Sequence, residues 1–198
     1  MFDSINPQHR AEFRRALANF HFEPFGDGNR VLFPRQKAVV AGAFRHRVNG
    51  GDERIDANVI TFEALSDILR TYFAQQAQHT AYYILPFTED VDPAQTLTAA
   101  TFHATMGEFT NYTEATRQTW AKDAEASQSI GNGTTPARFT INTGGGTVRG
   151  AAMSTQQAKL ANTGIIVPCA RFADDRVLAA GDKLDIEYVI QASDPDAP

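Results

Sequence analysis

The stretch that decides the fold reads DKLDIEYVIQ and spans residues 182–191. Apolar residues alternate with mostly charged ones along it, so Leu184, Ile186, Tyr188 and Ile190 share one side of an extended chain. This alternation is typical of an antiparallel strand with one face against a core and the other in water. We therefore predict a half-buried strand here.

Three further apolar runs precede this strand, at residues 137–141, 147–153 and 165–172. Turn sequences separate the runs, among them the three glycines at residues 144–146 and Ala-Gly-Asp at residues 180–182. Short apolar runs joined by turns at this spacing predict a mainly β fold, either a sandwich or a barrel of antiparallel strands.

The sequence before residue 38 has a different character and is interpreted as an amino-terminal arm, residues 1–37. Asn6 followed by Pro7 predicts the start of a short helix that runs to about residue 20, because Asn caps free amide groups and proline fits the first helical position. Loop and extended sequence follows it. A β-sandwich domain over residues 38–192 and a disordered tail over residues 193–198 complete the predicted organisation.

The most amphipathic segment of the chain is predicted to form a helix from Thr61 to about residue 76. Its apolar residues recur at helical spacing, at Phe62, Leu65, Ile68, Leu69, Tyr72 and Phe73. A helix with so distinct an apolar face usually buries it. We therefore expect Leu65, Ile68, Leu69 and Phe73 to pack on the sheet, and a charge at Leu69 to unfold the domain.

The other segments of the domain are assigned by the same rules. We predict two strands between residues 37 and 60 joined by a turn at residues 49–52, and a buried strand at residues 82–87. Two more strands are predicted between residues 102 and 120, where Phe102, Ala104 and Met106 alternate with other residues. Residues 121–135 are small and polar, which predicts a long exposed loop.

The composition argues against several classes of function. The 198 residues carry a net charge of −5, and their basic residues are scattered, so we expect no direct nucleic-acid binding. No apolar run reaches the roughly 20 residues that span a bilayer, so we expect no membrane contact. The chain has one cysteine and no secretory signal pattern at its start, which indicates assembly in a reducing cytoplasm without disulfides.

The residues that carry chemistry in enzymes do not form a recognisable constellation in this sequence. The five histidines include no close pair at metal-ligand spacing, and the glycines at residues 144–146 are not followed by the lysine of a phosphate-binding loop. Cys169 lies inside an apolar run, where a core position is favoured over a nucleophile. We therefore predict no enzyme activity, no catalytic or metal-binding residues and no cofactor.

A family resemblance rests on loose strand-and-turn motifs spread over roughly residues 38–192. The motifs are DANVIT at 56–61, YYILPF at 82–87, AATF at 99–102, EFTNYTEATR at 108–117, RFTIN at 138–142, VRGA at 148–151, ARF at 170–172 and AGDKL at 180–184. With these motifs the chain resembles a family of tailed-bacteriophage virion proteins. The resemblance implies an antiparallel β-sandwich, with a jelly-roll-like arrangement as one form of it, and a structural role in the virion.

Within that family the resemblance favours a head decoration or cement protein that stabilises the capsid lattice. The alternative is a small tail or tail-adaptor protein, and a carbohydrate-binding tail module that uses exposed Tyr112 and Trp120 is less favoured. A carbohydrate-active sandwich enzyme is the competing enzyme hypothesis, and it requires a groove with paired carboxylates and aromatic side chains.

The expected partners are the major capsid protein and copies of the chain itself, as a dimer or trimer, on a virion assembled in the host cytoplasm. The candidate contact residues are the apolar residues of the arm. They are Phe13, Leu17, Phe20, Phe22, Phe25 and Phe33.

Overall fold

A computed structural model of the protein describes residues 20–25, 29–34 and 39–193. The chain divides into two compact units, one formed by residues 1–39 with 193–198 and the other by residues 40–192. In the first unit, β1 (Phe20–Phe25) pairs antiparallel with β2 (Asn29–Pro34), with Phe20 opposite Pro34. The predicted arm helix and residues 194–198 of the predicted tail lie outside the described residues.

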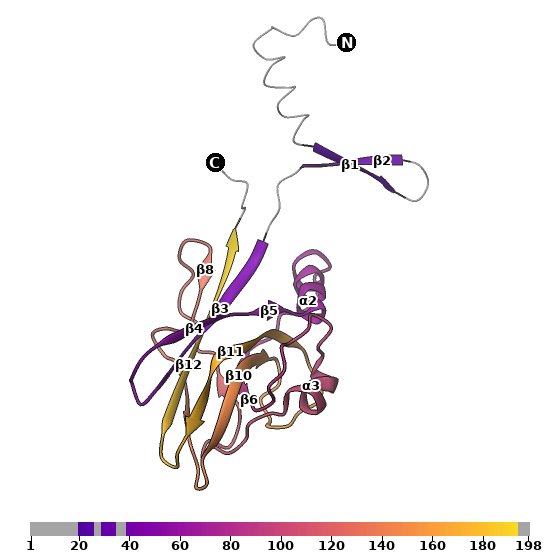
Figure 1. The fold of residues 1–198 in the computed structure, drawn as a ribbon. Helices are drawn as coiled ribbons and strands as arrows, with labels where there is room; N and C mark the ends of the chain where they lie inside the picture. Colours follow the sequence, from indigo (N-terminus) through magenta and orange to yellow (C-terminus); the bar gives the residue numbers. More distant parts are fainter. Residues whose placement is uncertain (1–19, 26–28, 35–38, 194–198) are drawn as a thin grey trace, which may run out of the picture. The chain divides into compact units, whose positions relative to one another are not determined.

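The larger unit is built from two antiparallel sheets of five strands each, which confirms the prediction of a mainly β fold (Figure 1). The first sheet has the order β5 (Val59–Ile60), β11 (Ile166–Leu178), β10 (Gly146–Ser154), β6 (Tyr83–Phe87) and β7 (Gln118–Thr119). The second has the order β4 (Arg54–Ala57), β3 (Val39–Val48), β12 (Lys183–Ser193) and β8 (Ser129–Ile130), and β9 (Ala137–Thr140) also pairs with β12.

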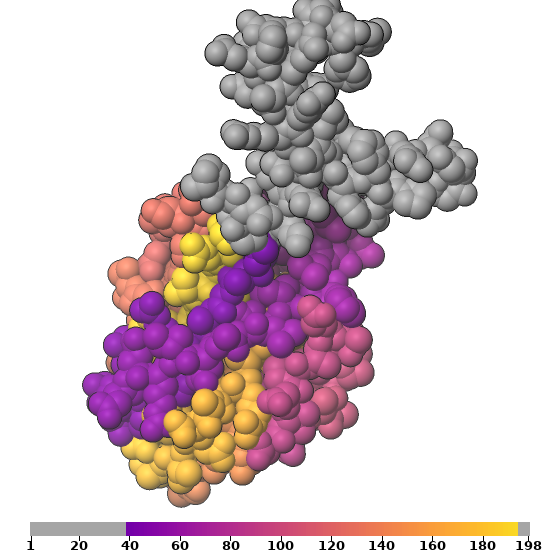
Figure 2. Space-filling view, turned by 45° about the horizontal axis from the view of Figure 1, so that its top comes forward, coloured from indigo at the N-terminus to yellow at the C-terminus, as the bar shows by residue number. Residues whose placement is uncertain are grey.

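The strand that decides the fold is β12, an inner strand of the second sheet. Figure 2 shows its yellow residues beside the indigo residues of β3, its neighbour in the sheet. Leu184, Ile186 and Tyr188 are completely buried, as the alternation predicts. The expectation that the opposite face of the strand lies in water is wrong, because Asp185 and Glu187 are also buried.

Arginines explain the burial of these two carboxylates. Arg138 of β9 donates two hydrogen bonds to Asp185, at 2.7 and 2.9 Å, and Arg47 of β3 donates one to Glu187, at 2.6 Å. The long arginine side chains cover this face of β12 while satisfying its charges.

The main core lies between the two sheets. It combines side chains from the facing sides of both, including Phe44, Phe139, Phe172, Ile84, Val148, Met153, Leu184, Ile186 and Tyr188. Two sheets that share one apolar layer are the arrangement expected of a sandwich-like domain. The turn at Asn49 and Gly50 joins β3 to β4 as predicted, and both residues have positive φ, the conformation that a tight hairpin turn requires.

A second core lies on the other face of the first sheet, beneath helix α3 (Ala99–Met106). The predicted strand over Phe102 to Met106 is therefore wrong. Thr98 and Thr101 form a capping box that begins a helix, and Phe102 and Met106 are four residues apart, a spacing that also places both on one helical face. Phe102 packs edge-on against Phe87 of β6.

Two further predictions concern the loop between β7 and β9 and the single cysteine of β11. The predicted exposed loop over residues 121–135 is wrong at Asn132, which is fully buried. Its side chain accepts a 2.7 Å hydrogen bond from the amide of Tyr188 and so anchors this segment on β12. Cys169 of β11 is fully buried and belongs to the second core, which confirms its core assignment.

Candidate functional site

Helix α2 (Phe62–Phe73) carries the most distinctive exposed surface of the larger unit. Figure 1 shows α2 beside β5 and above α3, and Ala64 of α2 belongs to the main core. Exposure reaches 58% for Leu69, 80% for Tyr72 and 74% for Phe73. We call the six exposed apolar side chains of the helix the α2 face, and they are Phe62, Leu65, Ile68, Leu69, Tyr72 and Phe73.

The expectation that this apolar stripe packs on the sheet is therefore wrong. Ala64 and Asp67 are the buried residues of the helix, and they lie on a different side of it. Thr61 caps the helix by accepting a 3.1 Å hydrogen bond from the amide of Ala64, and its hydroxyl donates to the carbonyl of Ile166 in β11. Asp67 accepts a hydrogen bond from His79 at 3.2 Å. These polar contacts fix the rotation of the helix so that the α2 face points outward.

The chemistry of the α2 face suits contact with another apolar surface. Spacing of 100° per residue places its six side chains within about 140° of the helix circumference, and none of them is charged. Tyr72 and Phe73 form an edge-to-face pair with ring centroids 5.2 Å apart. Contiguous exposed apolar surface of this kind marks sites of interaction rather than of reaction.

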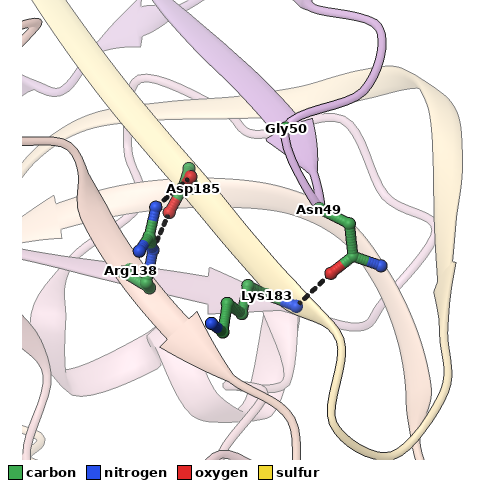
Figure 3. A pocket seen from close by; sticks show the side chains of 5 residues that line it. All are labelled: Asn49, Gly50, Arg138, Lys183 and Asp185. Atoms are coloured by element: carbon green, nitrogen blue, oxygen red, sulfur yellow. Dashed lines mark hydrogen bonds and ion pairs between the residues drawn. The ribbon is translucent and has the colours of Figure 1, made fainter.

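An open hollow of about 400 Å³ lies at the turn between β3 and β4 (Figure 3). Its lining residues are Asn49, Gly50, Arg138, Lys183 and Asp185. Figure 3 shows Arg138 and Asp185 directed at each other, and the side chain of Asn49 accepting a 2.9 Å hydrogen bond from the backbone amide of Lys183. The lining contains a single carboxylate and no aromatic side chain, unlike the groove that a carbohydrate-active enzyme requires.

The polar groups of this hollow form hydrogen bonds and an ion pair with one another and with the adjacent Asp182. Asn49 donates from its side-chain amide to Asp182 at 2.8 Å, and this bond, followed by one from the amide of Ala179, lowers the pKa of Asp182. The hydrogen bond and the charge of Asp185 raise the pKa of Arg138. The contacts connect the β3–β4 turn with the start of β12, so we assign the hollow a structural role.

A buried histidine joins β3, β4 and β11. The His46 ring stacks on Phe172 at a centroid distance of 3.6 Å. Nε of Arg176 donates to its Nδ1 at 2.8 Å, so Nδ1 is the acceptor and Nε2 carries the proton that is donated to Asp56, also at 2.8 Å. Asp56 accepts a further bond from the amide of Ala173. The arrangement holds a neutral imidazole between a cation and an anion.

This histidine predicts a pH dependence of stability. Burial lowers the pKa of His46 from its usual 6.5. The hydrogen bond that His46 donates to Asp56 opposes this effect, and the charges of Arg176 and Arg54 add to it. Because the unfolded chain then takes up a proton before the folded one, this contribution to stability is complete above pH 6.5 and is lost as the pH falls below it. Urea unfolding at pH 7.5 and 5.0 should show a smaller loss for His46→Gln than for the native chain. Equal losses in both proteins would contradict the assignment.

A second buried polar cluster surrounds the ion pair of Glu108 and Arg117, both of whose side chains are at most 1% exposed. Two parallel hydrogen bonds, of 2.9 and 2.7 Å, join them. Arg117 also donates to the carbonyls of Gln156 and Ala161, and the amide of Leu160 donates to Glu108. The cluster thus fastens residues 156–161 to the body of the domain.

The aromatic residues assigned to a carbohydrate-binding module are not exposed. Tyr112 retains 2% of its accessible surface and Trp120 retains 7%. The indole nitrogen of Trp120 donates to the carbonyl of Tyr188 at 3.0 Å, and the ammonium of Lys159 lies 3.5 Å from the centre of the Tyr112 ring. Neither ring provides a stacking platform for a sugar, so that use of the two residues is wrong.

The candidate contact residues of the arm fall partly outside the described residues. Phe13 and Leu17 lie there, whereas Phe20, Phe22 and Phe25 belong to β1 and Phe33 to β2. Among the described residues, no group of three or more His, Cys, Asp or Glu side chains is placed to hold a metal ion. Neither described helix is long and apolar enough to cross a membrane.

Comparison of the chain with protein-family models, with curated proteins and with solved structures found no match.

The α2 face is the surface that sequence reasoning assigned to the core. A signal for it existed in the chain, because Thr61, Ala64 and Asp67 supply a cap, a small residue and a hydrogen-bonding group on another side of the same helix.

Proposed function

We propose that this chain is a structural protein of a bacteriophage virion, and specifically a head decoration or cement protein that stabilises the capsid lattice. The observation that carries the proposal is the α2 face, an uncharged apolar surface displayed on a compact domain of two antiparallel sheets. The resemblance of its sequence motifs to those of tailed-bacteriophage virion proteins supports the same role. Cementing requires many modest contacts repeated by symmetry and no catalytic group.

In this proposal the two parts of the chain make different contacts. The arm, with Phe13, Leu17, Phe20, Phe22, Phe25 and Phe33, binds the major capsid protein, and the larger unit contacts neighbouring copies of itself. The two sheets act as a sandwich that carries the contacts between copies, and a jelly-roll order of the strands stays a prediction. Each subunit then adds apolar burial, about 25 cal/mol per Å², across a joint of the lattice.

The position and copy number of the protein on the particle test this proposal. We expect electron microscopy of purified virions, with quantitative mass spectrometry, to find hundreds of copies distributed over the head. A count of six or twelve at one vertex or along the tail would instead assign the protein to the tail or its adaptor. Absence from the virion would contradict both assignments.

A further inference from the structure

We propose that the α2 face binds the α2 face of a second copy of this chain, with the two helices antiparallel about a two-fold axis. The inference rests on the proposed function for its setting, because it names the contact between neighbouring copies. It makes a claim about the purified protein that can be tested without a virion.

The size of the α2 face fits a dimer contact. An aromatic side chain contributes roughly 150–250 Å² when it is fully buried, and the exposed parts of the six side chains together present roughly 600 Å². A stable interface of standard size buries about 800 Å² on each partner. The α2 face alone therefore supplies most of the area that a dimer needs, with residues beside the helix available for the remainder.

The order of residues along the helix makes the α2 face self-complementary. Leu65 and Leu69 lie two residues on either side of Asp67, and Phe62 and Tyr72 lie five residues on either side of it. A two-fold axis at the height of Asp67 would therefore place Leu65 against the partner's Leu69 and Phe62 against the partner's Tyr72. Such reciprocal pairing, in which residue i contacts j and j contacts i, defines a two-fold interface.

The orientation of the helix makes this contact accessible. Asp67 and Ala64 point into the domain, and the centre of the apolar arc lies about 140° away around the helix axis. Apolar side chains with aromatic residues among them and without charge are typical of the buried centre of an interface between identical subunits. A second helix can lie along the α2 face without displacing any of the hydrogen bonds that hold the first.

Sedimentation equilibrium of the full chain tests the proposal with two matched variants. Leu69→Asp puts a charge in the centre of the α2 face, and Val177→Asp puts one at a residue of β11 that is 79% exposed. We expect the native chain and Val177→Asp to be dimers, and Leu69→Asp to dissociate about a hundredfold more readily or to be a monomer. The melting temperature of each sample, measured by circular dichroism at low protein concentration, separates dissociation from unfolding.

Cross-linking gives a second and independent readout. Cys169 is completely buried, so a cysteine placed at Leu69 is the reactive one. A short bis-maleimide should join two Leu69→Cys chains into a covalent dimer and should leave Val177→Cys chains single. Equal cross-linking of both variants would contradict the two-fold contact.

The outcomes separate this inference from the proposed function. A native chain that is a monomer at all soluble concentrations, a dimer that Leu69→Asp leaves intact, or a trimer that Leu69→Asp dissociates would each overturn the two-fold pairing. If a monomeric native chain lost capsid binding on the Leu69→Asp change, the occupant of the α2 face would be the capsid protein. A dimer that depends on Leu69 in a protein absent from virions would support the pairing and refute only the proposed function.

Discussion

Replacing Arg117 with methionine is expected to destabilise the domain by about 3–5 kcal/mol, a large part of the roughly 5–15 kcal/mol that holds a domain of this size folded. The change leaves the carboxylate of Glu108, which is completely buried, without its opposite charge. It also removes the hydrogen bonds that Arg117 donates to the carbonyl oxygens of Gln156 and Ala161. Urea unfolding followed by circular dichroism measures the loss.

A matched change at the surface provides the control for this experiment. Arg171 forms an ion pair with Asp90, and both side chains are partly exposed, so Arg171→Met should cost no more than about 1 kcal/mol. Adding Glu108→Leu to Arg117→Met should restore part of the lost stability, because the uncompensated buried charge disappears. If Arg117→Met lowered the free energy of unfolding as little as Arg171→Met, the ion pair of Glu108 and Arg117 would not stabilise the domain as we describe.

Gly150→Ala is expected to be the most damaging single-methyl addition in the first sheet, with a cost of about 3 kcal/mol or more. Gly150 lies in β10 beside a shift in the register with β11, and the ring of Phe87 and the carbonyl oxygen of Ala170 occupy the space that a Cβ atom would need. The ring can move only at the expense of the second core, and the carbonyl belongs to the neighbouring strand. A fall in the melting temperature measures the effect.

Gly133→Ala is the matched control for this prediction. The nearest atoms to a Cβ at Gly133 are side-chain oxygens at 3.6 and 3.9 Å, which is ordinary van der Waals contact. The added methyl group should change stability by only a few tenths of a kcal/mol, or raise it, because alanine restricts the unfolded chain. If both alanine variants melted at the native temperature, the close packing of Phe87 over β10 would be refuted.

The periodicity of the sequence predicts which residues share a face, but it does not say where that face points. For β12 the prediction is confirmed at Leu184, Ile186 and Tyr188. The hydrogen bonds of β12 to a strand on each side fix which of its faces points into the core. For α2 the helix begins at Phe62, directly after its predicted first residue, yet its rotation is set by Thr61 and Asp67 instead of by its apolar stripe. The helical periodicity of residues 62–73 therefore led to a core assignment for residues that form the exposed α2 face.

Other features could not be read from the sequence because they depend on contacts between distant residues. Glu108 and Arg117 are close in sequence, but their burial depends on residues 156–161, which fold over them from elsewhere in the chain. The helix α3 was mistaken for a strand because Phe102 and Met106 satisfy both periodicities, and the Thr98 capping box decides between them.

The place of β12 in the second sheet has a consequence for how the protein folds during its synthesis. β12 separates β3 from β8 and β9, so β3 obtains its second neighbour, and β8 and β9 obtain the strand that they pair with, only after residues 183–193 have left the ribosome. Until then Phe44 of β3 and Phe139 of β9, both completely buried in the folded domain, lack the strand that covers them. Contacts that span so much of the chain form slowly. The nascent chain therefore passes through a stage with an open sheet, and the exposed apolar surface of such a stage favours aggregation.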